Sequence, residues 1–528
     1  MDDDLPTDFQ VIVVGTGMVE SIVAAACSRI GKSVLHLDSN DHYGGLWASY
    51  NFDGLQKFLK DVNSDPERQL QVYNVSEKWY IEKEPTEQKK ADGEENKTED
   101  GKEPKKVWFQ ADFTSEYRKF NIDMTPKLLF SRGPLVELLI SSNIARYAEF
   151  RCVTRVLTWL DERLTPVPCS RADVFATEAV GIVEKRMLMK MLTSIVGYND
   201  EEMNNEFKDW NDKTFKEYLT NKGLTPNLIH YVLYAIAGGN NNMACLEGVK
   251  ECKKFLMSLG RYGNTPFLWP MYGSGELPQC FCRLCAVFGG VYCLNRPIDR
   301  VSSKTVDEGK TVLTIESKSK TLQCDHLVIG INDCPKSLIS SEPQEGSEGR
   351  DISKAIFITN GSVLPSAKEP LTLLRFPPLA GDDAVTALEV GPATGSCPKG
   401  LFVVYFMINK SEDAETDLMP YAERIFDMSG GDQTQTGDKP KCLWSVFYNV
   451  SDRSAMVRSA LPTAHVCSGP DSGLDFDAAV LQAEEVFKTI CPGEEFLPRA
   501  PDPEEIVFED DVTHGPEFER HHDETNLA

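Results

Sequence analysis

The clearest hydrophobic pattern in the chain covers residues 10–45. Val11–Val14 is a short β-branched run, which predicts a strand buried on both faces of a parallel sheet. Met18–Ile30 has helical spacing and ends before Gly31, a residue that favours the position after a helix C-terminus. Ser33–Leu37 predicts a second strand. The order strand, glycine turn, helix, strand is typical of the first unit of a dinucleotide-binding fold.

The turn between the first strand and the helix departs from the dinucleotide fingerprint at one position. Gly15 and Gly17 supply a tight turn and backbone N–H groups, and Asp38 stands where an acid would bind a ribose hydroxyl. Glu20 occupies the place where G-x-G-x-x-G requires a small residue. A carboxylate there crowds the helix against the strand and puts negative charge near the pyrophosphate. We therefore expect a nucleotide-binding turn that has lost its nucleotide, with a functional cofactor site as the alternative.

Residues 126–237 carry a helical pattern. Apolar segments at helical spacing recur in it at 128–130, 135–140, 144–150 and 228–237. The strongest helix prediction is Ala179–Val196. Its apolar stripe consists of Val180, Val183, Met187, Leu188, Met191, Leu192 and Ile195. Such a stripe is usually core, and the alternative is an apolar groove, because methionine adapts to lipid-like ligands. We expect an inserted all-helical domain.

The flanking parts of the chain predict strands. The candidate strands are Val291–Leu294, Val312–Glu316, His326–Ile329, Ala355–Ile358, Leu401–Met407 and Leu443–Tyr448. We assign residues 1–125 and 238–500 to a mixed α/β (α+β) domain with several sheets. Residues 82–106 are charged and almost free of apolar side chains, so they predict a disordered insertion. The acidic tail 501–528 is expected to be mobile.

Composition excludes several classes of protein. The chain has 528 residues, with 81 acidic and 55 basic side chains and a formal charge of -26, which argues against binding to a nucleic-acid backbone. No apolar run is long enough to span a bilayer, and the acidic start is no signal peptide. The fifteen cysteines show no disulfide framework, so we expect reduced thiols and a cytosolic protein. Cys280, Cys282 and Cys285 lie close together, but no nearby histidine completes a metal site. No nucleophile–base motif is present, which favours a protein without catalytic activity.

Two short segments are candidates for a binding surface. Glu276, Gln279 and Arg283 fall at i, i+3 and i+7 of a helix predicted to end at Gly289, so they share one face. Tyr43 stands in a glycine turn, His42 to Gly45. For the helix the alternatives are a protein contact and a solvated face; for Tyr43 they are an exposed binding residue and a ring that packs its own turn.

Several stretches together resemble the Rab escort protein and Rab GDP-dissociation inhibitor family. They are VIVVGTGMVESI, VLHLDSNDHYGG, FNIDMTPKLLFSRG, ARYAEF, GRYGNTPFLWPMYGSGELPQCFCRLCAVFGGVYCLN and VCSGPDSGL. The resemblance is dense over residues 8–60 and 107–300 and thin over 301–500. It implies a flavoprotein-like fold without flavin or another cofactor, and a helical domain that holds a prenyl chain. It also implies a non-catalytic protein with a Rab-binding platform that includes Tyr43, Glu276, Gln279 and Arg283.

The segment VPCSRADVFATEAVGIVEKRMLMKML favours the escort branch of that family. Escort proteins dock on the α subunit of the type II geranylgeranyltransferase α/β heterodimer through a Phe and an Arg eleven residues later. Phe175 and Arg186 occupy those positions. The resemblance therefore implies binding of GDP-bound Rab GTPases, unprenylated and prenylated, of the transferase and of geranylgeranyl lipid, with transient membrane contact. The alternatives are a Rab GDP-dissociation inhibitor and, more distantly, an FAD-dependent oxidoreductase.

Overall fold

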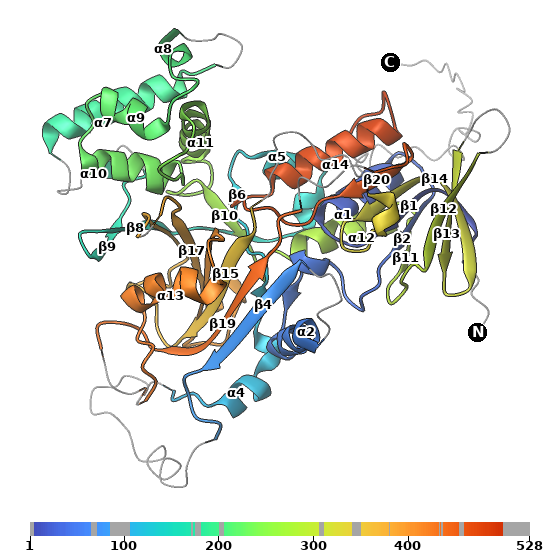
Figure 1. Cartoon of the computed structure of the whole chain (residues 1–528), viewed down its shortest axis with the longest axis horizontal. Coiled ribbons are helices and arrows are strands. Elements are labelled where there is room, and N and C mark those ends of the chain that lie inside the picture. The colour runs from blue at the N-terminus through green and yellow to red at the C-terminus, as the bar shows by residue number, and fades with distance from the viewer. Residues whose placement is uncertain are drawn as a thin grey trace, which may run out of the picture.

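The computed structural model describes residues 5–64, 71–84, 106–169, 173–174, 181–199, 205–305, 311–339, 350–379, 381–431, 433, 437–453 and 459–499. The acidic tail lies outside the described residues, as does the predicted insertion except for its two ends. Two large sheets and a lobe of helices make up the described part (Figure 1). The predicted α/β class with several sheets and a set of helices is confirmed.

The first sheet contains the predicted dinucleotide-type unit. Its parallel strands run in the order β11 (Val291–Cys293), β2 (Val34–Leu37), β1 (Asp8–Val14), β14 (Lys320–Gly330) and β20 (Ala464–Cys467). Two antiparallel strands, β13 (Thr311–Ser317) and β12 (Arg300–Thr305), extend it from the first half of β14. In this strand order the glycine turn follows the central strand β1 at its carboxyl end, which is where such folds place their ligands.

Three helices cover one face of this sheet. They are α1 (Met18–Arg29), α12 (Glu276–Val287) and α14 (Asp477–Ile490). α1 packs against both of the others, and every residue of α1 except Arg29 is buried. Small side chains such as Ala24–Ala26 allow this close approach on several sides. α12 therefore rests on a rigid, fully packed support.

The second sheet has eight strands. Their order is β4 (Val72–Trp79), β19 (Cys442–Val450), β15 (Ile352–Thr359), β18 (Phe402–Asn409), β17 (Val385–Val390), β16 (Thr372–Phe376), β8 (Arg155–Leu160) and β9 (Arg163–Pro166). Helix α13 (Ala414–Ile425) packs on one face, and a large apolar core fills the other. α2 (Phe52–Ser64) packs against the edge strand β4, and α4 (Gln110–Ser115) packs against α2. Two small sheets, β6 (Leu129–Phe130)–β10 (Phe267–Pro270)–β7 (Phe150–Cys152) and β3 (Ser49–Tyr50)–β5 (Ile122–Asp123), connect the parts.

A lobe of helices stands beside the large sheet and occupies the upper left of Figure 1. It contains α7 (Ile182–Val196), α8 (Asn205–Lys208), α9 (Phe215–Asn221), α10 (Pro226–Ile229), a π-helical turn (His230–Ile236) and α11 (Cys245–Ser258). α7 and α9 both pack on α11. Burial of large apolar side chains such as Phe215 and Tyr218 holds these helices together.

The helical region differs from the prediction at its start and along its apolar stripe. Residues 129–166 contain β6, β7, β8 and β9 besides the predicted helix α5 (Pro134–Ser141), because their strand partners lie far away in the sequence. On α7, Leu188, Met191, Leu192 and Ile195 are buried as expected. Val183, which the stripe also included, is 71% exposed.

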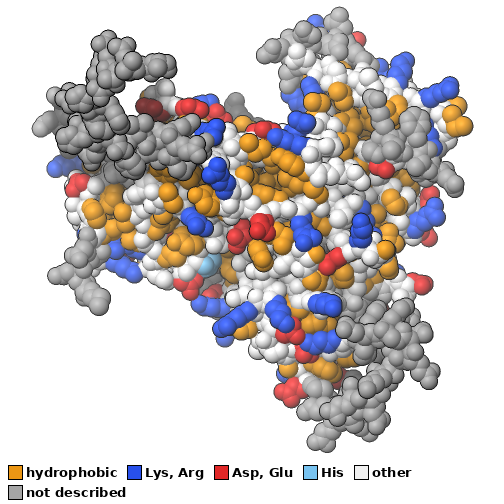
Figure 2. Space-filling view, turned by 180° about the vertical axis from the view of Figure 1, so that it is seen from behind, with side chains coloured by type: hydrophobic (Ala, Val, Ile, Leu, Met, Phe, Trp, Pro, Cys, Tyr) orange, Lys and Arg blue, Asp and Glu red, His pale blue; other side chains and the backbone are white. Residues whose placement is uncertain are grey.

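The surface carries mixed side chains. Figure 2 shows Lys and Arg scattered among apolar and acidic groups on the face opposite to that of Figure 1. Within the described part of the chain, none of the helices combines the length and the apolar character that crossing a bilayer requires.

Candidate functional site

The four side chains predicted for a contact surface line one surface pocket of about 280 Å³. Tyr43 comes from the loop after β2, and Glu276, Gln279 and Arg283 come from α12. The other lining residues are Tyr147, Cys280, Cys282, Ala286 and Tyr292. The spacing i, i+3, i+7 thus placed three polar side chains on one face, and the fold brings the tyrosine to them. We call these nine residues the platform pocket.

Arg283 is held by an aromatic ring from a distant segment. Its guanidinium carbon lies 4.9 Å from the ring centroid of Tyr147, a cation–π arrangement. The Cys280 thiol donates to the Tyr147 carbonyl oxygen at 3.5 Å, which ties the segment to α12. Tyr147 is 41% exposed, so ring and guanidinium both face solvent. Sequence reasoning did not assign Tyr147, although it lies in the stretch ARYAEF.

Tyr43 rests on a second tyrosine that is anchored below it. The rings of Tyr43 and Tyr292 meet edge to face, with centroids 6.0 Å apart. His36 Nε2 donates to the Gly15 carbonyl oxygen at 2.5 Å, so Nδ1 of the neutral ring accepts from the Tyr292 hydroxyl at 3.0 Å. Burial lowers the pKa of His36 to about 4, which keeps the ring neutral at physiological pH. The floor of the platform pocket is therefore fixed by hydrogen bonds to the glycine turn.

A buried carboxylate holds the loop that precedes α12. Asp123 accepts from the Ser274 backbone N–H at 2.8 Å and from the Ser49 hydroxyl. Ser49 in turn accepts from the Gly275 N–H at 2.9 Å. Burial raises the pKa of Asp123 to about 6. These bonds fix the loop that leads into Glu276, whose own pKa is raised because burial penalises its charged form.

Glu20 fills the space over the glycine turn. A methyl group on Gly17 would lie 2.6 Å from Glu20 Oε2, and the other carboxyl oxygen packs against Gly330 across the turn. Glu20 is 5% exposed, and its Oε2 has no hydrogen-bond partner among the described residues. Burial raises the pKa of this carboxyl to about 8, with Asp333 and Asp38 adding to the shift. The side chain is therefore neutral at pH 7 and sits where a pyrophosphate would approach the helix N-terminus.

Asp38 also has protein partners in place of a ribose. One carboxyl oxygen accepts from the Thr16 N–H at 2.9 Å and from its hydroxyl at 2.5 Å. The Thr16 hydroxyl accepts from the Gly44 N–H at 2.8 Å, and the second Asp38 oxygen accepts from the Asn40 N–H at 2.7 Å. The glycine turn and its acid thus hold the loop that presents Tyr43.

These residues do not fit a bound dinucleotide. Glu20 occupies the cradle, and Asp333 approaches Gly15 so closely that a methyl group there would lie 3.2 Å from a carboxylate oxygen. Neutral Glu20 blocks the pyrophosphate by its volume, and Asp333 adds a carboxylate beside Gly15. Asp38 is engaged by Thr16 and Asn40. Asp38 and Thr16 instead hold the loop that presents Tyr43 to the platform pocket.

The second predicted contact lies at the start of α7. Arg186 is exposed, and Phe175 lies outside the described residues. Ile182 and Val183, one turn before Arg186, are 76% and 71% exposed. Glu184 caps the helix by accepting from the Gly181 N–H at 2.8 Å. The helix therefore presents two apolar side chains and an arginine to solvent. The apolar stripe predicted a core position for Val183, and that prediction is wrong.

Comparison with family models gives two matches. A model described as "GDP dissociation inhibitor" matches residues 1–86 and 106–342. A second, described as "RAE1/2 domain I, C-terminal region", matches residues 352–472.

Known proteins of similar sequence extend the match to nearly the whole chain. Rab proteins geranylgeranyltransferase component A 1 of Rattus norvegicus is 36% identical, with 97% of this chain and 95% of the relative covered. Rab proteins geranylgeranyltransferase component A of Drosophila melanogaster is 38% identical, with 96% and 93% covered.

Solved structures show the same fold at low sequence identity. The Rab GDI from Plasmodium falciparum has a TM-score of 0.62 at 17% identity, with 92% of this chain and 99% of that chain covered. An oxidoreductase from Methanosarcina mazei has a TM-score of 0.53 at 10% identity, with 91% and 100% covered. The described architecture is therefore shared with both inhibitors and oxidoreductases.

Proposed function

Because this chain belongs to the Rab escort protein and Rab GDP-dissociation inhibitor family, we propose that it acts as a Rab escort protein. In this role it is a non-catalytic component of Rab geranylgeranylation. It binds GDP-bound, unprenylated Rab GTPases, presents them to the geranylgeranyltransferase, retains the prenylated product and delivers it to membranes.

The observation that carries this proposal is the platform pocket. Tyr43, Glu276, Gln279 and Arg283 come from two elements and meet around one pocket, on a support fixed by His36 and Asp123. A half-buried tyrosine and an arginine held over an aromatic ring are types of side chain that dominate binding energies at protein interfaces. The pocket is small and has no nucleophile–base pair, so its chemistry suits recognition of a protein surface.

The helical lobe supplies the proposed site for the lipid. Each buried CH₂ group is worth about 0.8 kcal/mol, so a bare geranylgeranyl chain drives a protein onto membranes. A carrier must therefore cover the chain with apolar side chains. The lobe offers an adaptable apolar interior at α7, where Met191 is buried and Met189 packs at the edge of the core.

Docking on the transferase is assigned to the start of α7. Arg186 and the exposed Ile182 and Val183 form a mixed apolar and cationic patch, and Phe175 precedes it in the sequence. We propose that Phe175 and Arg186 contact the α subunit of the α/β transferase. The protein acts from the cytosol in this scheme and meets membranes only during delivery.

The nearer alternative is a Rab GDP-dissociation inhibitor, which shares the platform. Identities of 36% and 38% to proteins named as component A, over almost their entire lengths, favour the escort branch. An FAD-dependent oxidoreductase shares the fold, but Glu20 fills the place that its cofactor needs.

Titration of a fluorescent, GDP-bound and unprenylated Rab tests the proposal. We expect saturable binding to the purified chain, weakened by about tenfold or more in Arg283→Ala, because a truncated hot-spot arginine costs about 2 kcal/mol. Arg300→Ala is the matched control, since Arg300 is exposed on β12 and does not line the platform pocket, and it should bind as wild type. Equal affinity of the Arg283 variant and the wild type would remove the platform pocket from the interface.

A further inference from the structure

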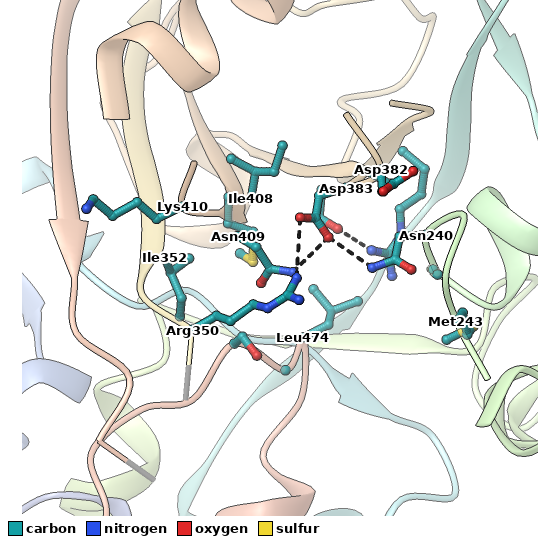
Figure 3. Close-up of a pocket in the computed structure, with 18 of the residues that line it drawn as sticks. Asn240, Met243, Arg350, Ile352, Asp382, Asp383, Ile408, Asn409, Lys410 and Leu474 are labelled. Atoms are coloured by element: carbon teal, nitrogen blue, oxygen red, sulfur yellow. Dashed lines mark hydrogen bonds and ion pairs between the residues drawn. The ribbon is translucent and has the colours of Figure 1, made fainter. Parts of the chain in front are cut away.

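A second and larger cavity lies between the helical lobe and the eight-stranded sheet. Its volume is about 1370 Å³, and it shares no residue with the platform pocket. One wall is the loop 238–243 and the adjoining face of α11. The opposite wall is formed by the loop 381–384, the end of β18 and the start of α13, as Figure 3 shows in part.

The rim of this cavity is held by amide–carboxylate hydrogen bonds. Asp383 accepts from the side-chain amides of Asn240 and Asn409, both at 2.9 Å, and Arg350 approaches it at 3.8 Å (Figure 3). The Asn242 amide donates to Asp382 at 2.8 Å. These bonds join the loop of the lobe to the loop of the sheet, so the cavity has a defined shape.

Its lining is acidic. Nine carboxylates and four basic side chains line the cavity, so it attracts positive charge. The whole chain is also negatively charged, at -26. The acidic residues are Glu247, Glu251, Asp382, Asp383, Glu412, Asp417, Asp452, Asp475 and Asp477. The basic residues are Lys254, Arg350, Arg375 and Lys410.

Two of the carboxylates make no direct ion pair. Glu247 and Glu251 lie one turn apart on α11 and face the cavity together. Among the described residues, neither makes a direct ion pair, although the positive charges of Lys254 and Arg375 act on Glu251. Lys254, at the end of the same face, is engaged by Asp475 at 2.6 Å and Asp477 at 2.5 Å.

Arg375 provides a second, independent argument for a ligand in this cavity. It lines the same cavity and is only 9% exposed. Its Nη1 donates to the Thr386 hydroxyl, but its Nε has no acceptor among the described residues. The enclosed Nε is out of reach of a ligand, but Nη2 has no acceptor among the described residues and leaves a donor for an oxygen atom of a ligand. The ligand must therefore bring acceptors to Arg375 and positive charge to Glu247 and Glu251.

We propose that this cavity binds an extended, Lys- and Arg-rich peptide segment of a partner protein. Backbone carbonyl oxygens of the segment accept from Arg375, while its basic side chains pair with Glu247 and Glu251. A free anion is disfavoured by nine carboxylates, and a small cation makes no use of Arg375. The inference does not depend on Rab binding, so the two can fail separately.

Fluorescence anisotropy with synthetic peptides tests the proposal on the purified full-length chain. The probes are a short labelled Lys–Ser repeat and its Glu–Ser counterpart. The Lys–Ser peptide should bind, with an affinity that falls as salt rises, and the Glu–Ser peptide should not bind. Binding of both peptides, or of neither, overturns the proposal.

A matched pair of double variants locates the site. Glu247→Gln with Glu251→Gln should weaken binding of the Lys–Ser peptide on the order of tenfold, because two ion pairs are lost. Glu485→Gln with Glu494→Gln removes the same charge from exposed positions outside the cavity and should retain wild-type affinity. An equal loss in both double variants would mean general charge attraction, and that result contradicts the proposal, as does an unchanged affinity in the cavity variant.

Discussion

The Arg283 guanidinium lies over the ring of Tyr147, with 4.9 Å between its carbon and the ring centroid. The two residues come from α12 and from a 3₁₀ turn, Ile144–Tyr147, and the Cys280 thiol joins the same two elements. The arrangement limits the rotamers of a long, charged side chain before any partner arrives. Pre-organisation of this kind lowers the entropic cost of binding.

Replacing Tyr147 with alanine should therefore weaken Rab binding through Arg283. An exposed cation–π contact is worth about 0.5–1 kcal/mol, so we expect a two- to fivefold loss of affinity, and Tyr147→Phe should retain most of it. A double-mutant cycle in the Rab titration measures the coupling. If Tyr147→Ala and Arg283→Ala act additively, the ring does not work through the guanidinium.

Thr16→Val should loosen the loop that carries Tyr43. The hydroxyl accepts from Gly44 N–H and donates to Asp38, so an isosteric apolar side chain leaves two buried groups short of a partner. We expect a loss of about 1–3 kcal/mol in the free energy of unfolding, together with weaker Rab binding. Thr16→Ser keeps the hydroxyl and should recover both. Urea unfolding and the Rab titration check the two effects, and full stability of Thr16→Val would contradict the role of this bond.

Glu20 should make stability depend on pH. Because burial raises the pKa of this carboxyl to about 8, the folded chain holds a proton between its ordinary value of 4.5 and about 8 that the unfolded chain releases. Over that window the free energy of unfolding falls as pH rises, by about 1.4 kcal/mol per pH unit from this group, and the fall ends above the folded pKa. Glu20→Gln stays neutral and should show a shallower decline. Urea unfolding of both proteins between about pH 5.5 and about pH 8 measures the difference; parallel curves would show that Glu20 is not buried in protonated form.

If Phe175 and Arg186 contact the transferase, substituting them should weaken transferase binding and leave Rab binding intact. Phe175→Ala should abolish formation of the ternary complex, and Arg186→Glu should weaken it by more than about tenfold, while Rab binding is spared in both. Lys190→Glu makes the same charge change one turn further along α7, on an exposed side chain, and serves as the control. Size-exclusion chromatography of the three-component mixture reads out the complex. Normal assembly with Phe175→Ala would refute the assignment.

The first unit of the fold and the face of α12 could be predicted from local sequence. Periodicity identified β1, α1, β2 and the shared face of Glu276, Gln279 and Arg283, because each depends on neighbours in the chain. The fingerprint likewise singled out Glu20, and the structure adds that its side chain fills the cradle.

Features that depend on distant segments could not be predicted in this way. β8 was assigned to a helical region because its partner in the sheet, β16, lies far along the chain. Tyr147 and Tyr292 reach the platform pocket only through folding. Val183 fits the apolar stripe of α7, but no other part of the described structure covers it. The large acidic cavity is lined by residues between 130 and 477, so no local sequence pattern predicts it.

Geranylgeranylation of an unmodified Rab in vitro tests the escort function most directly. The reaction contains GDP-bound Rab, geranylgeranyl diphosphate and the α/β transferase, with and without the purified chain, and mass spectrometry follows the lipid on the Rab. We predict prenylated Rab only when the chain is present, and strongly reduced product with Arg283→Ala or Phe175→Ala. Equal product without the chain, or firm Rab binding with no support of prenylation, would contradict an escort function; the second result would identify a GDP-dissociation inhibitor instead.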